Sequence, residues 1–370
     1  MRIRSAVLRE RGGPFTIEDV ELADPGPGEV LVEIAGTGFC HTDLLPRAKG
    51  FMAEPPLILG HEGSGVVRAK GSDVDDLAIG DPVVLSFDHC GSCTACGDGH
   101  PAYCRSFWGR NMVGRAKGGD PRVRDMDGAP IGAHWFGQSS FASHVLVAAR
   151  NAVPIPKDLP LELLGPLGCG VLTGAGSILN VLQVSAGSST AVYGAGTVGL
   201  SAVMAAAAAG AERIIAVDLH RSRLDLALEL GATDVVDAAG LSTTEVSQRV
   251  IELSEGGTLT ALDTTGAVPV ITAGVAALRT RGTLAMVSVV HGDIVLPGDA
   301  LATGKTVTGI LEGDAVPRLL IPELIELWLE GRLPFDRLIR TYPISDINQA
   351  EADMASGTTI KPVLIPGGQA

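Results

Sequence analysis

The stretch "STAVYGAGTVGLSAVMAAAAAGAERIIAVDLHRSR", residues 189–223, decides the fold of this chain. An apolar run at 190–193 leads into a glycine-rich turn, and an alanine-rich stretch of helical character follows the turn. A second apolar run at 213–217 ends in Asp218, which lies 19 residues after the last glycine of the turn. A strand, a Gly-x-Gly-x-x-Gly turn, a helix and a second strand that ends in an acid together predict a dinucleotide-binding βαβ unit.

The three glycines of the turn have separate tasks in such a unit. Gly194 permits the tight turn, Gly196 lets a pyrophosphate approach the backbone, and Gly199 lets the helix pack closely on the strand. The pyrophosphate is expected at the N-terminus of the helix, where unpaired backbone N–H groups favour anions.

Asp218 predicts which dinucleotide binds. Its carboxylate would accept hydrogen bonds from the adenosine ribose hydroxyls and would repel a 2′-phosphate, so we expect NAD rather than NADP. Arg223 follows on the next helix, where it lies either beside the same ribose or on an exposed helix face.

The alternation of strands and helices continues beyond this unit. Six strands with intervening helices predict a complete doubly wound parallel sheet over residues 171–311. The further strands are expected at 233–237, 259–263, 283–289 and 305–311, and the helices at 221–230, 244–254 and 269–279.

The flanking segments have a different pattern. Residues 1–150 contain short β-like runs separated by Gly, Pro and Asp, which predicts a small, irregular, mostly β domain. Residues 106–133 read as a long exposed loop or insertion. The last part, 312–370, contains a helix at 317–330 and then a helix and a strand within 341–366. The doubly wound domain is therefore expected to be inserted between two parts of the other domain.

Length, composition and charge limit the alternatives. With 370 residues the chain exceeds the usual size of one hydrophobic core, so two domains are expected. Hydrophobic residues make up 46% and charged residues 19%, as in globular proteins. The net charge of −14 disfavours nucleic acid and anionic membranes as partners.

No apolar run approaches the roughly 20 residues of a membrane span. The first residues, "MRIRSAVLRERGG", lack the apolar core of a signal peptide. We therefore expect a soluble, cytoplasmic protein whose thiols stay reduced, which favours metal binding over disulfides.

Four of the six cysteines lie within the segment "DHCGSCTACGDGHPAYC", residues 88–104. The spacing, with two residues between successive cysteines and a fourth cysteine eight positions later, matches a tetrahedral zinc site of four thiolates. Disulfides, free thiols or an iron–sulfur cluster are the weaker alternatives. Four thiolates leave no open position, so this zinc would be structural. The ligands are Cys90, Cys93, Cys96 and Cys104.

A second set of metal-binding residue types is spread along the chain. Cys40 lies in "GFCHTD", His61 and Glu62 lie in "LGHEGSG", and Cys169 lies in "GPLGCG" just before a predicted helix. One imidazole and two thiolates can hold zinc and leave a fourth position open, as catalytic zinc requires. Taken singly, a cysteine is more often a small buried hydrophobe and a histidine is usually structural.

Six segments, in this order along the chain, resemble the zinc-containing alcohol dehydrogenases of the medium-chain dehydrogenase/reductase family. Within that family the chain resembles the bacterial aryl (benzyl) alcohol dehydrogenases. The segments are "GFCHTD", "LGHEGSGVV", "GDPVVLSFDHCGSCTACGDGHPAYC", "HWFGQSSFASHVLV", "LLGPLGCGVLTGAGSILN" and "VYGAGTVGL".

The resemblance implies a fold and its domains. A GroES-like catalytic domain would comprise residues 1–170, with the structural-zinc lobe at about 88–105, and residues 312–370. A Rossmann NAD-binding domain would comprise residues 171–311, and the active site would lie in the cleft between the two domains.

The resemblance also implies two zinc ions per subunit and roles for single residues. Cys40, His61 and Cys169 would bind the catalytic zinc, and the four clustered cysteines the lobe zinc. Glu62 would approach the catalytic metal during ligand exchange. Thr42 would hydrogen-bond the substrate oxygen, and Asp43 would orient the zinc-bound imidazole.

Further positions follow from the same resemblance. Leu45 stands where liver-type enzymes have the terminal histidine of a proton relay, so the proton needs another exit, such as the cofactor ribose. The cofactor would contact Thr173 and Val198 at the nicotinamide ring, Thr197 in the glycine-rich turn, and His41 and Lys361 at the pyrophosphate. The substrate pocket would contain Ser86, Trp135, Phe136 and Leu311.

The implied activity is NAD-dependent oxidation of a primary aromatic or allylic alcohol to its aldehyde, and the reverse reduction. Zinc would act as a Lewis acid, Thr42 would take up the proton, and hydride would pass to the nicotinamide. The alternatives are a glutathione-dependent formaldehyde dehydrogenase and, in a different class, a non-catalytic NAD-binding protein. The expected partners are small alcohols and aldehydes and further copies of the chain, as a dimer or a tetramer.

Overall fold

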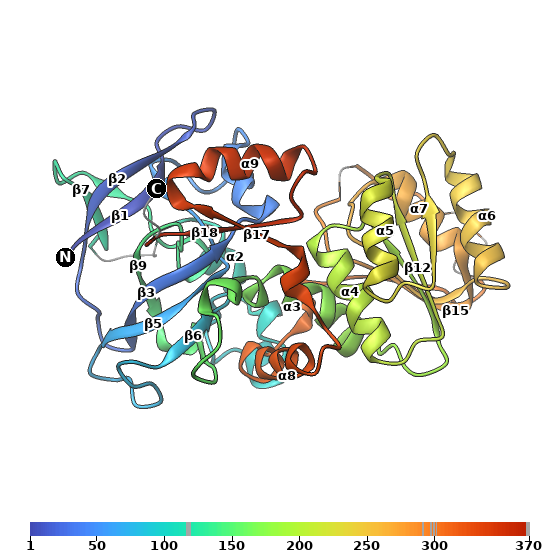
Figure 1. Cartoon of the computed structure of the whole chain (residues 1–370), viewed down its shortest axis with the longest axis horizontal. Helices are drawn as coiled ribbons and strands as arrows, with labels where there is room; N and C mark the ends of the chain where they lie inside the picture. Colours follow the sequence, from blue (N-terminus) through green and yellow to red (C-terminus); the bar gives the residue numbers. More distant parts are fainter. Residues whose placement is uncertain (116–119, 291, 297, 299, 301, 368–370) are drawn as a thin grey trace. The chain divides into compact units, whose positions relative to one another are not determined.

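The computed structural model describes residues 1–115, 120–290, 292–296, 298, 300 and 302–367. The chain divides into two compact units (Figure 1). The first unit comprises Met1–Cys169, Val316–Pro322 and Asp336–Ala370, and the second comprises Gly170–Ala315 and Glu323–Phe335. The second unit is thus inserted into the first, which continues at Val316–Pro322 and again from Asp336.

The first unit contains a five-stranded sheet with the order β4-β1-β2-β7-β8. Its strands are β1 (Arg2–Leu8), β2 (Phe15–Leu22), β4 (Leu57–Ile58), β7 (Val123–Asp125) and β8 (Pro130–Ile131).

The segment 106–133, expected as a long exposed loop or insertion, contains regular structure in its described part, which a plain loop would not have. Helix α2 (Phe107–Asn111) and the antiparallel pair of β7 and β8 lie there. The Asp125 carboxylate accepts hydrogen bonds from the backbone N–H groups of Asp127 and Ala129, which closes the turn between the two strands.

A second sheet of the first unit has the order β10-β6-β5-β3-β18-β17, and β9 also pairs with β3. Strand β18 pairs with the end of β3 through Val363 opposite Gly38, so the C-terminal part of the chain returns to the segment that precedes Cys40. Helix α9 (Ile347–Ala355) contacts β17 and β18 (Figure 1). The strands are β3 (Glu29–Gly38), β5 (Gly63–Lys70), β6 (Pro82–Leu85), β9 (His144–Ala148), β10 (Ala152–Pro154), β17 (Ile339–Pro343) and β18 (Lys361–Ile365).

The second unit contains a six-stranded sheet with the order β13-β12-β11-β14-β15-β16, and all its neighbouring strands are parallel. The chain moves outward from β11 to β13, returns to β14 on the other side of β11 and continues to β16. This is the doubly wound Rossmann order that the sequence predicts. The strands are β11 (Ser189–Tyr193), β12 (Arg213–Asp218), β13 (Asp234–Asp237), β14 (Thr258–Asp263), β15 (Leu278–Met286) and β16 (Thr306–Gly309).

The helices of the second unit begin and end close to the predicted residues. Helix α6 starts after Ser242, whose hydroxyl accepts a hydrogen bond from the Glu245 backbone N–H, while the Glu245 carboxylate accepts from the Ser242 backbone. Strand β15 begins at Leu278, five residues before the predicted strand, and follows directly after α7. The helices are α3 (Gly170–Gly176), α4 (Thr197–Ala208), α5 (Arg221–Glu229), α6 (Thr243–Leu253) and α7 (Val268–Ala277).

Alternate residues of the central strands form one face of the core of the second unit. Ala191 and Tyr193 on β11, with Ile215 and Val217 on β12, are buried against side chains of α6 and α7. Their period of two places these side chains on one face of the sheet. Among the described residues, no helix has both the length and the apolarity that crossing a bilayer requires.

Candidate active site

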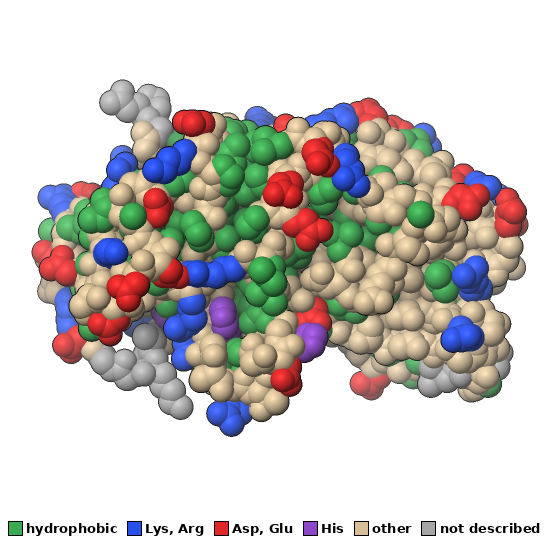
Figure 2. All heavy atoms as spheres, turned by 90° about the horizontal axis from the view of Figure 1, so that it is seen from below, with side chains coloured by type: hydrophobic (Ala, Val, Ile, Leu, Met, Phe, Trp, Pro, Cys, Tyr) green, Lys and Arg blue, Asp and Glu red, His purple; other side chains and the backbone are tan. Residues whose placement is uncertain are grey.

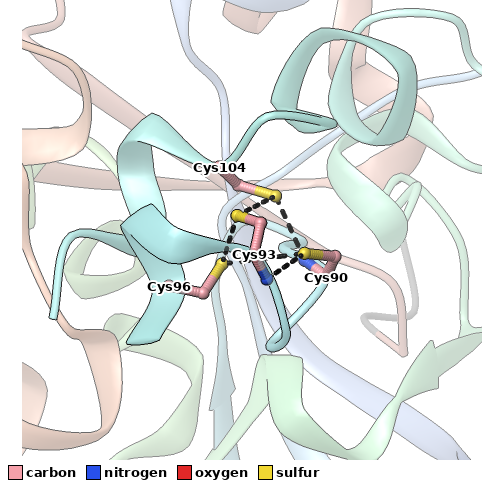
Figure 3. A group of neighbouring side chains, drawn as sticks. All are labelled: Cys90, Cys93, Cys96 and Cys104. Atoms are coloured by element: carbon pink, nitrogen blue, oxygen red, sulfur yellow. Dashed lines mark hydrogen bonds between the residues drawn. The ribbon is translucent and has the colours of Figure 1, made fainter. Parts of the chain in front are cut away.

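The four clustered cysteines of the first unit bring their sulfur atoms together (Figure 3). The Sγ–Sγ distances are 3.6 Å for Cys93–Cys96, 3.9 Å for Cys90–Cys96 and 4.0 Å for Cys93–Cys104. A disulfide needs about 2.05 Å, so these sulfurs are not bonded to one another. Four ligands about 2.3 Å from a tetrahedral centre would lie about 3.8 Å apart, and the observed distances bracket that value.

The backbone around this cluster favours thiolates. The N–H groups of Ser92 and Cys93 donate to the Cys90 sulfur, and these bonds lower the pKa of Cys90 to about 5. Burial raises the pKa of Cys96 to about 12. A bound divalent cation would deprotonate such a thiol outright, so the donor set suits a zinc ion. Cys93 precedes helix α1 (Thr94–Gly97), Cys96 lies within it, and Cys104 follows the short helix at Pro101–Tyr103.

The other two cysteines meet at a second cluster in the first unit. Ligand atoms of Cys40, His61, Glu62 and Cys169 all lie within 4.8 Å of one another. These residues come from three separate places: the end of β3, the segment between β4 and β5, and the last residue before α3. The six cysteines of the chain therefore divide completely between two clusters.

The orientation of His61 is set from one side of its ring. Nδ1 lies 2.8 Å from Asp43 Oδ1, so Nδ1 carries the proton and donates it to this carboxylate. His61 Nε2 is buried and has no hydrogen-bond partner among the residues that the structure describes. A buried nitrogen lone pair with no partner, beside two sulfurs, fits a metal ligand whose other nitrogen is held by a carboxylate.

Asp43 itself is fully buried and fixed by the backbone. Its Oδ2 accepts from the Cys40 N–H at 3.1 Å, and its Oδ1 accepts from the Gly60 N–H at 3.1 Å. A hydrogen bond from Cys169 lowers the pKa of Cys40 well below its ordinary value, against the effect of burial. The thiolate form is the one that binds metal. Two sulfurs and an imidazole nitrogen therefore fit zinc, with a further position left open.

Glu62 is paired with Lys361 across the same cluster. Lys361 Nζ donates to Glu62 Oε1 at 2.8 Å, to Glu62 Oε2 at 2.7 Å and to the Phe39 carbonyl at 3.1 Å. Lys361 is only 2% exposed, and its ammonium is directed at Glu62 rather than at solvent. The role of Lys361 at a cofactor pyrophosphate stays a prediction.

Trp135 and Phe136 lie behind the imidazole of His61. The Trp135 indole Nε1–H donates to Asp43 Oδ1 at 2.9 Å, and the Phe136 ring stacks on the His61 ring with centroids 4.3 Å apart. The two side chains are 0% and 2% exposed. Their predicted place in a substrate pocket is untested, whereas their contacts to the metal-binding cluster are direct.

The remaining predicted residues of the first unit lie close to the cluster in sequence or in space. Thr42 is half-buried and His41 is exposed, both directly after Cys40. The Ser86 hydroxyl is buried and donates to the Gly168 carbonyl at 2.8 Å, one residue before Cys169. Gln138 was not predicted: its amide donates to the His61 carbonyl at 2.9 Å and accepts from the Gly63 N–H at 3.1 Å. No motif in the sequence marks Gln138.

The glycine turn of the second unit has the geometry that the sequence requires. Gly194 has φ +91°, and a Cβ there would lie 2.4 Å from the Thr264 hydroxyl oxygen. A Cβ on Gly199 would lie 1.8 Å from the Gly194 carbonyl oxygen. Gly196 directly precedes helix α4, and a Cβ there would meet no atom of the described residues within 4 Å. The turn is therefore tight at two glycines and open at the third.

Asp218 lies beside this turn. Its Oδ2 accepts from the Ala195 N–H at 2.6 Å and its Oδ1 from the His220 N–H at 2.8 Å. Arg223 lies half-buried on α5, and its buried Nε has no hydrogen-bond partner within the described ranges. The other predicted cofactor and pocket residues of this unit are Thr173 on α3, Thr197 and Val198 at the start of α4, and the half-buried Leu311.

A cavity of about 970 Å³ in the first unit is separate from both cysteine clusters. Four arginines and two histidines are among its lining residues. Three of its four arginines are already paired: Arg110 and Arg150 bond to Asp88, and Arg122 bonds to Glu29. Figure 2 shows Lys and Arg side chains beside a histidine on the face of the molecule that it draws. Paired arginines make this cavity a weaker candidate for catalysis than the buried Cys–His cluster.

Comparison with known families agrees with this geometry. The model of the alcohol dehydrogenase GroES-like domain matches residues 26–157, and the model of a zinc-binding dehydrogenase matches residues 197–329. The chain belongs to the zinc-containing alcohol dehydrogenases of the medium-chain dehydrogenase/reductase family. Such enzymes use zinc and a nicotinamide dinucleotide, and the predicted family, fold class and enzyme class are confirmed.

Individual relatives are similar over almost the whole chain. Geraniol dehydrogenase of Castellaniella defragrans is 43% identical over 98% of this chain and 97% of its own length. The crystal structure of an alcohol dehydrogenase zinc-binding domain protein from Burkholderia ambifaria has a TM-score of 0.96 and 48% identity, with 99% of each chain covered. The crystal structure of benzyl alcohol dehydrogenase from Acinetobacter calcoaceticus has a TM-score of 0.94 and 41% identity, again with 99% of each chain covered.

Proposed function

We propose that this chain oxidises primary aromatic or allylic alcohols to aldehydes, reversibly, with NAD as the hydride acceptor and two zinc ions per chain. The observation that carries the proposal is the convergence of Cys40, His61 and Cys169, with the buried Nε2 of His61 left without a hydrogen-bond partner in the described part of the chain. Zinc held there would supply a Lewis acid that lowers the pKa of an alcohol.

The chain's own residues provide binding and proton handling. Asp43 keeps the proton of His61 on Nδ1, which leaves Nε2 as a lone pair. Thr42 lies two residues after Cys40, and its hydroxyl oxygen is the proposed acceptor of the substrate hydroxyl proton. Leu45 supplies no titratable group, so the proton must leave from Thr42 by a route that avoids it.

The preference for NAD over NADP rests on Asp218. Its two carboxylate oxygens are anchored by backbone N–H groups beside the glycine turn, so the negative charge is fixed there. A 2′-phosphate at the same place would meet like charge. The open space at Gly196, at the N-terminus of α4, supports a pyrophosphate site.

The substrate class rests on two relatives of the chain. One is named for geraniol and one for benzyl alcohol, and both compounds are primary alcohols with an unsaturated carbon next to the carbinol. The serine at position 86, beside the carbonyl that precedes Cys169, would leave more room for a ring than a phenylalanine would.

A steady-state assay tests this function. Reduction of NAD⁺ and NADP⁺ is measured with benzyl alcohol, cinnamyl alcohol, geraniol and ethanol, and metal content is measured on the same protein. We expect turnover with the first three alcohols, a preference for NAD⁺ and two zinc ions per chain. The variant H61A should lose turnover and one zinc ion but retain NADH binding.

Two results would overturn the proposal. Full activity of H61A with one zinc ion per chain would remove the proposed site from the mechanism. Turnover of formaldehyde only when glutathione is added, with none of the three unsaturated alcohols oxidised, would assign the chain to glutathione-dependent formaldehyde oxidation instead.

A further inference from the structure

The segment Trp135–Ser139, which we call the clamp segment, has an unusual backbone. Phe136 has φ +51° and Ser139 has φ +52°, a region that non-glycine residues rarely adopt. Such strain persists only where surrounding contacts hold it in place, and it concentrates at functional sites. The Ser139 hydroxyl provides part of that hold, since it accepts from the Trp135 N–H at 2.9 Å and donates to the Ile58 carbonyl at 2.7 Å.

Trp135 connects the clamp segment to the edge of the His61 ring, by way of Asp43. The indole N–H can only donate, and its acceptor is Asp43 Oδ1, the same oxygen that accepts from His61 Nδ1. Asp43 Oδ1 thus holds three donors within 3.1 Å, because the Gly60 N–H is the third. The indole fixes the carboxylate that fixes the imidazole.

The same segment also covers the face of the ring and the backbone of His61. Phe136 stacks at 4.3 Å with an interplanar angle of 21°. Gln138 bonds to the His61 carbonyl and to the Gly63 N–H, on either side of Glu62. Edge, face and backbone of one proposed metal ligand are therefore all held by five consecutive residues.

We propose that Trp135 and Phe136 are positioning residues for the metal ligand His61, rather than substrate-contacting residues. The inference rests on the proposed function, because it takes His61 as a zinc ligand. Partners behind a ligating histidine fix its tautomer and ring orientation, and their loss typically costs about 10- to 100-fold in metal affinity. Trp135 acts through Asp43, and Phe136 acts through the ring itself.

The variant W135F tests the role of the indole N–H, because it keeps an aromatic ring and removes only the donor group and the second ring. Zinc release to a chromogenic chelator is followed over time, and the cobalt-substituted protein is examined by visible absorption. We expect one of the two ions to dissociate about 10- to 100-fold faster and the cobalt bands of that site to shift. Release from the four-cysteine site should keep its wild-type rate.

Trp108 provides the matched control. It is 53% exposed on α2, so W108F makes the same chemical change at an indole that packs on Phe107 instead of donating to Asp43, and it should leave both release rates and the cobalt bands unchanged. The variant F136L keeps the indole and removes the stacked ring; faster release of the same ion is expected there as well. Wild-type release rates and cobalt bands in both W135F and F136L would overturn the inference.

A measurement on the unmutated protein keeps the inference testable if W135F does not fold. The chain has three tryptophans, so ¹⁵N-indole labelling gives three N–H resonances, and W108F and W328F assign the third to Trp135. Removal of the ion bound by His61 changes the electric field at Asp43 Oδ1, which accepts from both the imidazole and the indole, and should move this resonance. A Trp135 resonance that does not respond to metal removal would contradict the inference.

Failure of the inference and failure of the proposed function remain distinguishable. If H61A keeps two zinc ions and full activity, the proposed function fails. If H61A loses one ion and its activity while W135F and F136L retain both at wild-type release rates, only the positioning role fails.

Discussion

At the residue scale, Glu62 and Lys361 form a buried ion pair, and losing either charge is expected to destabilise the fold. Both side chains are almost fully buried, at 0% and 3% exposure. Burial lowers the pKa of Lys361, but the carboxylate of Glu62 and the thiolate of Cys40 together raise it above its ordinary value. The two charges compensate each other inside the protein. Removing one partner leaves the other charge buried and uncompensated.

The variant K361M should therefore lower the free energy of unfolding by about 3–5 kcal/mol. Denaturant titration of the zinc-loaded protein measures this loss, with K361R as the charge-preserving control. The double variant E62Q/K361M should recover most of the stability, since no buried charge remains without its partner. A double variant as unstable as K361M would show that the ion pair is not the cause.

His134 makes the stability of the folded chain depend on pH. Burial lowers the pKa of His134, and the nearby Asp88 carboxylate, 3.8 Å from Nε2, opposes this only in part. The unfolded chain then binds protons that the folded chain does not, so stability falls as the pH drops below about 6.5. We expect the melting temperature of H134Q to fall less than that of the wild type between pH 7.5 and 5.5. The exposed His220 provides the control H220Q, and equal slopes for all three proteins would contradict the expectation.

Whether the sequence predicts the role of a single residue depends on the kind of contact that the residue makes. Cys40, His61 and Cys169 are predictable because a metal ligand must be one of a few residue types in a recognisable segment. Trp135 is not predictable as a partner of Asp43, because the two lie 92 positions apart and an indole hydrogen bond leaves no motif. Its place in a substrate pocket was expected from the family resemblance alone and stays a prediction.

At the scale of the element, two glycines of the turn between β11 and α4 are expected to have different roles. Gly199 allows close packing in the fold, and Gly196 leaves space for the cofactor. A Cβ added at Gly199 would lie only 1.8 Å from the Gly194 carbonyl oxygen, whereas a Cβ added at Gly196 would point into open space. G199A should destabilise the second unit by about 1–3 kcal/mol, as overpacking does. G196A should leave the melting temperature unchanged and weaken NADH binding by at least about tenfold, or 1.4 kcal/mol.

Thermal unfolding and NADH fluorescence titration of the two variants measure these effects. The variants are controls for each other, because each makes the same Gly-to-Ala change within three residues. Equal losses of binding and of stability in both would contradict the division of tasks.

The elements themselves were predictable where they are long and periodic. Helices α5, α6 and α7 begin and end within two residues of the expected positions, since their apolar spacing repeats over several turns. Strands β7 and β8 were missed because they have three and two residues, too few for alternation to show. Their pairing depends on contacts with β2 that lie far away in the sequence.

At the scale of the whole molecule, the two metal-binding clusters of the first unit are joined by aromatic rings. Phe107 follows Cys104 by three residues, and its ring meets Phe136 edge-on with centroids 6.4 Å apart. Phe136 in turn stacks on His61. An edge-on aromatic pair contributes about 0.5–1.5 kcal/mol, which corresponds to about 2- to 10-fold in a rate.

The variant C96S should therefore do more than remove the lobe ion. We expect one zinc per chain in place of two, a lower melting temperature, and release of the remaining ion about 2- to 10-fold faster than in the wild type. Elemental analysis and chelator kinetics measure these changes, with W108F as the control within the same region. Wild-type release of the remaining ion would show that the two sites are independent.

The division of the chain into units was visible in the change from irregular β-like runs to regular alternation near residue 170. The helix predicted at 317–330 forms as α8 (Pro317–Leu329), but the boundary between the units falls within it, at Pro322. The second half groups with the second unit, where Trp328 packs against Phe335 at 5.3 Å. A single helical pattern cannot show such a division, because both halves have the same period.

The placement of the six cysteines determines how oxidation would damage this protein. All six cysteines belong to one of the two clusters, so the chain has no spare thiol that could react harmlessly. Peroxide or an alkylating reagent that modifies any of them would attack a proposed zinc ligand, and reaction would be accompanied by loss of an ion. Free zinc in the medium would then report damage to this protein before any loss of its secondary structure could be seen.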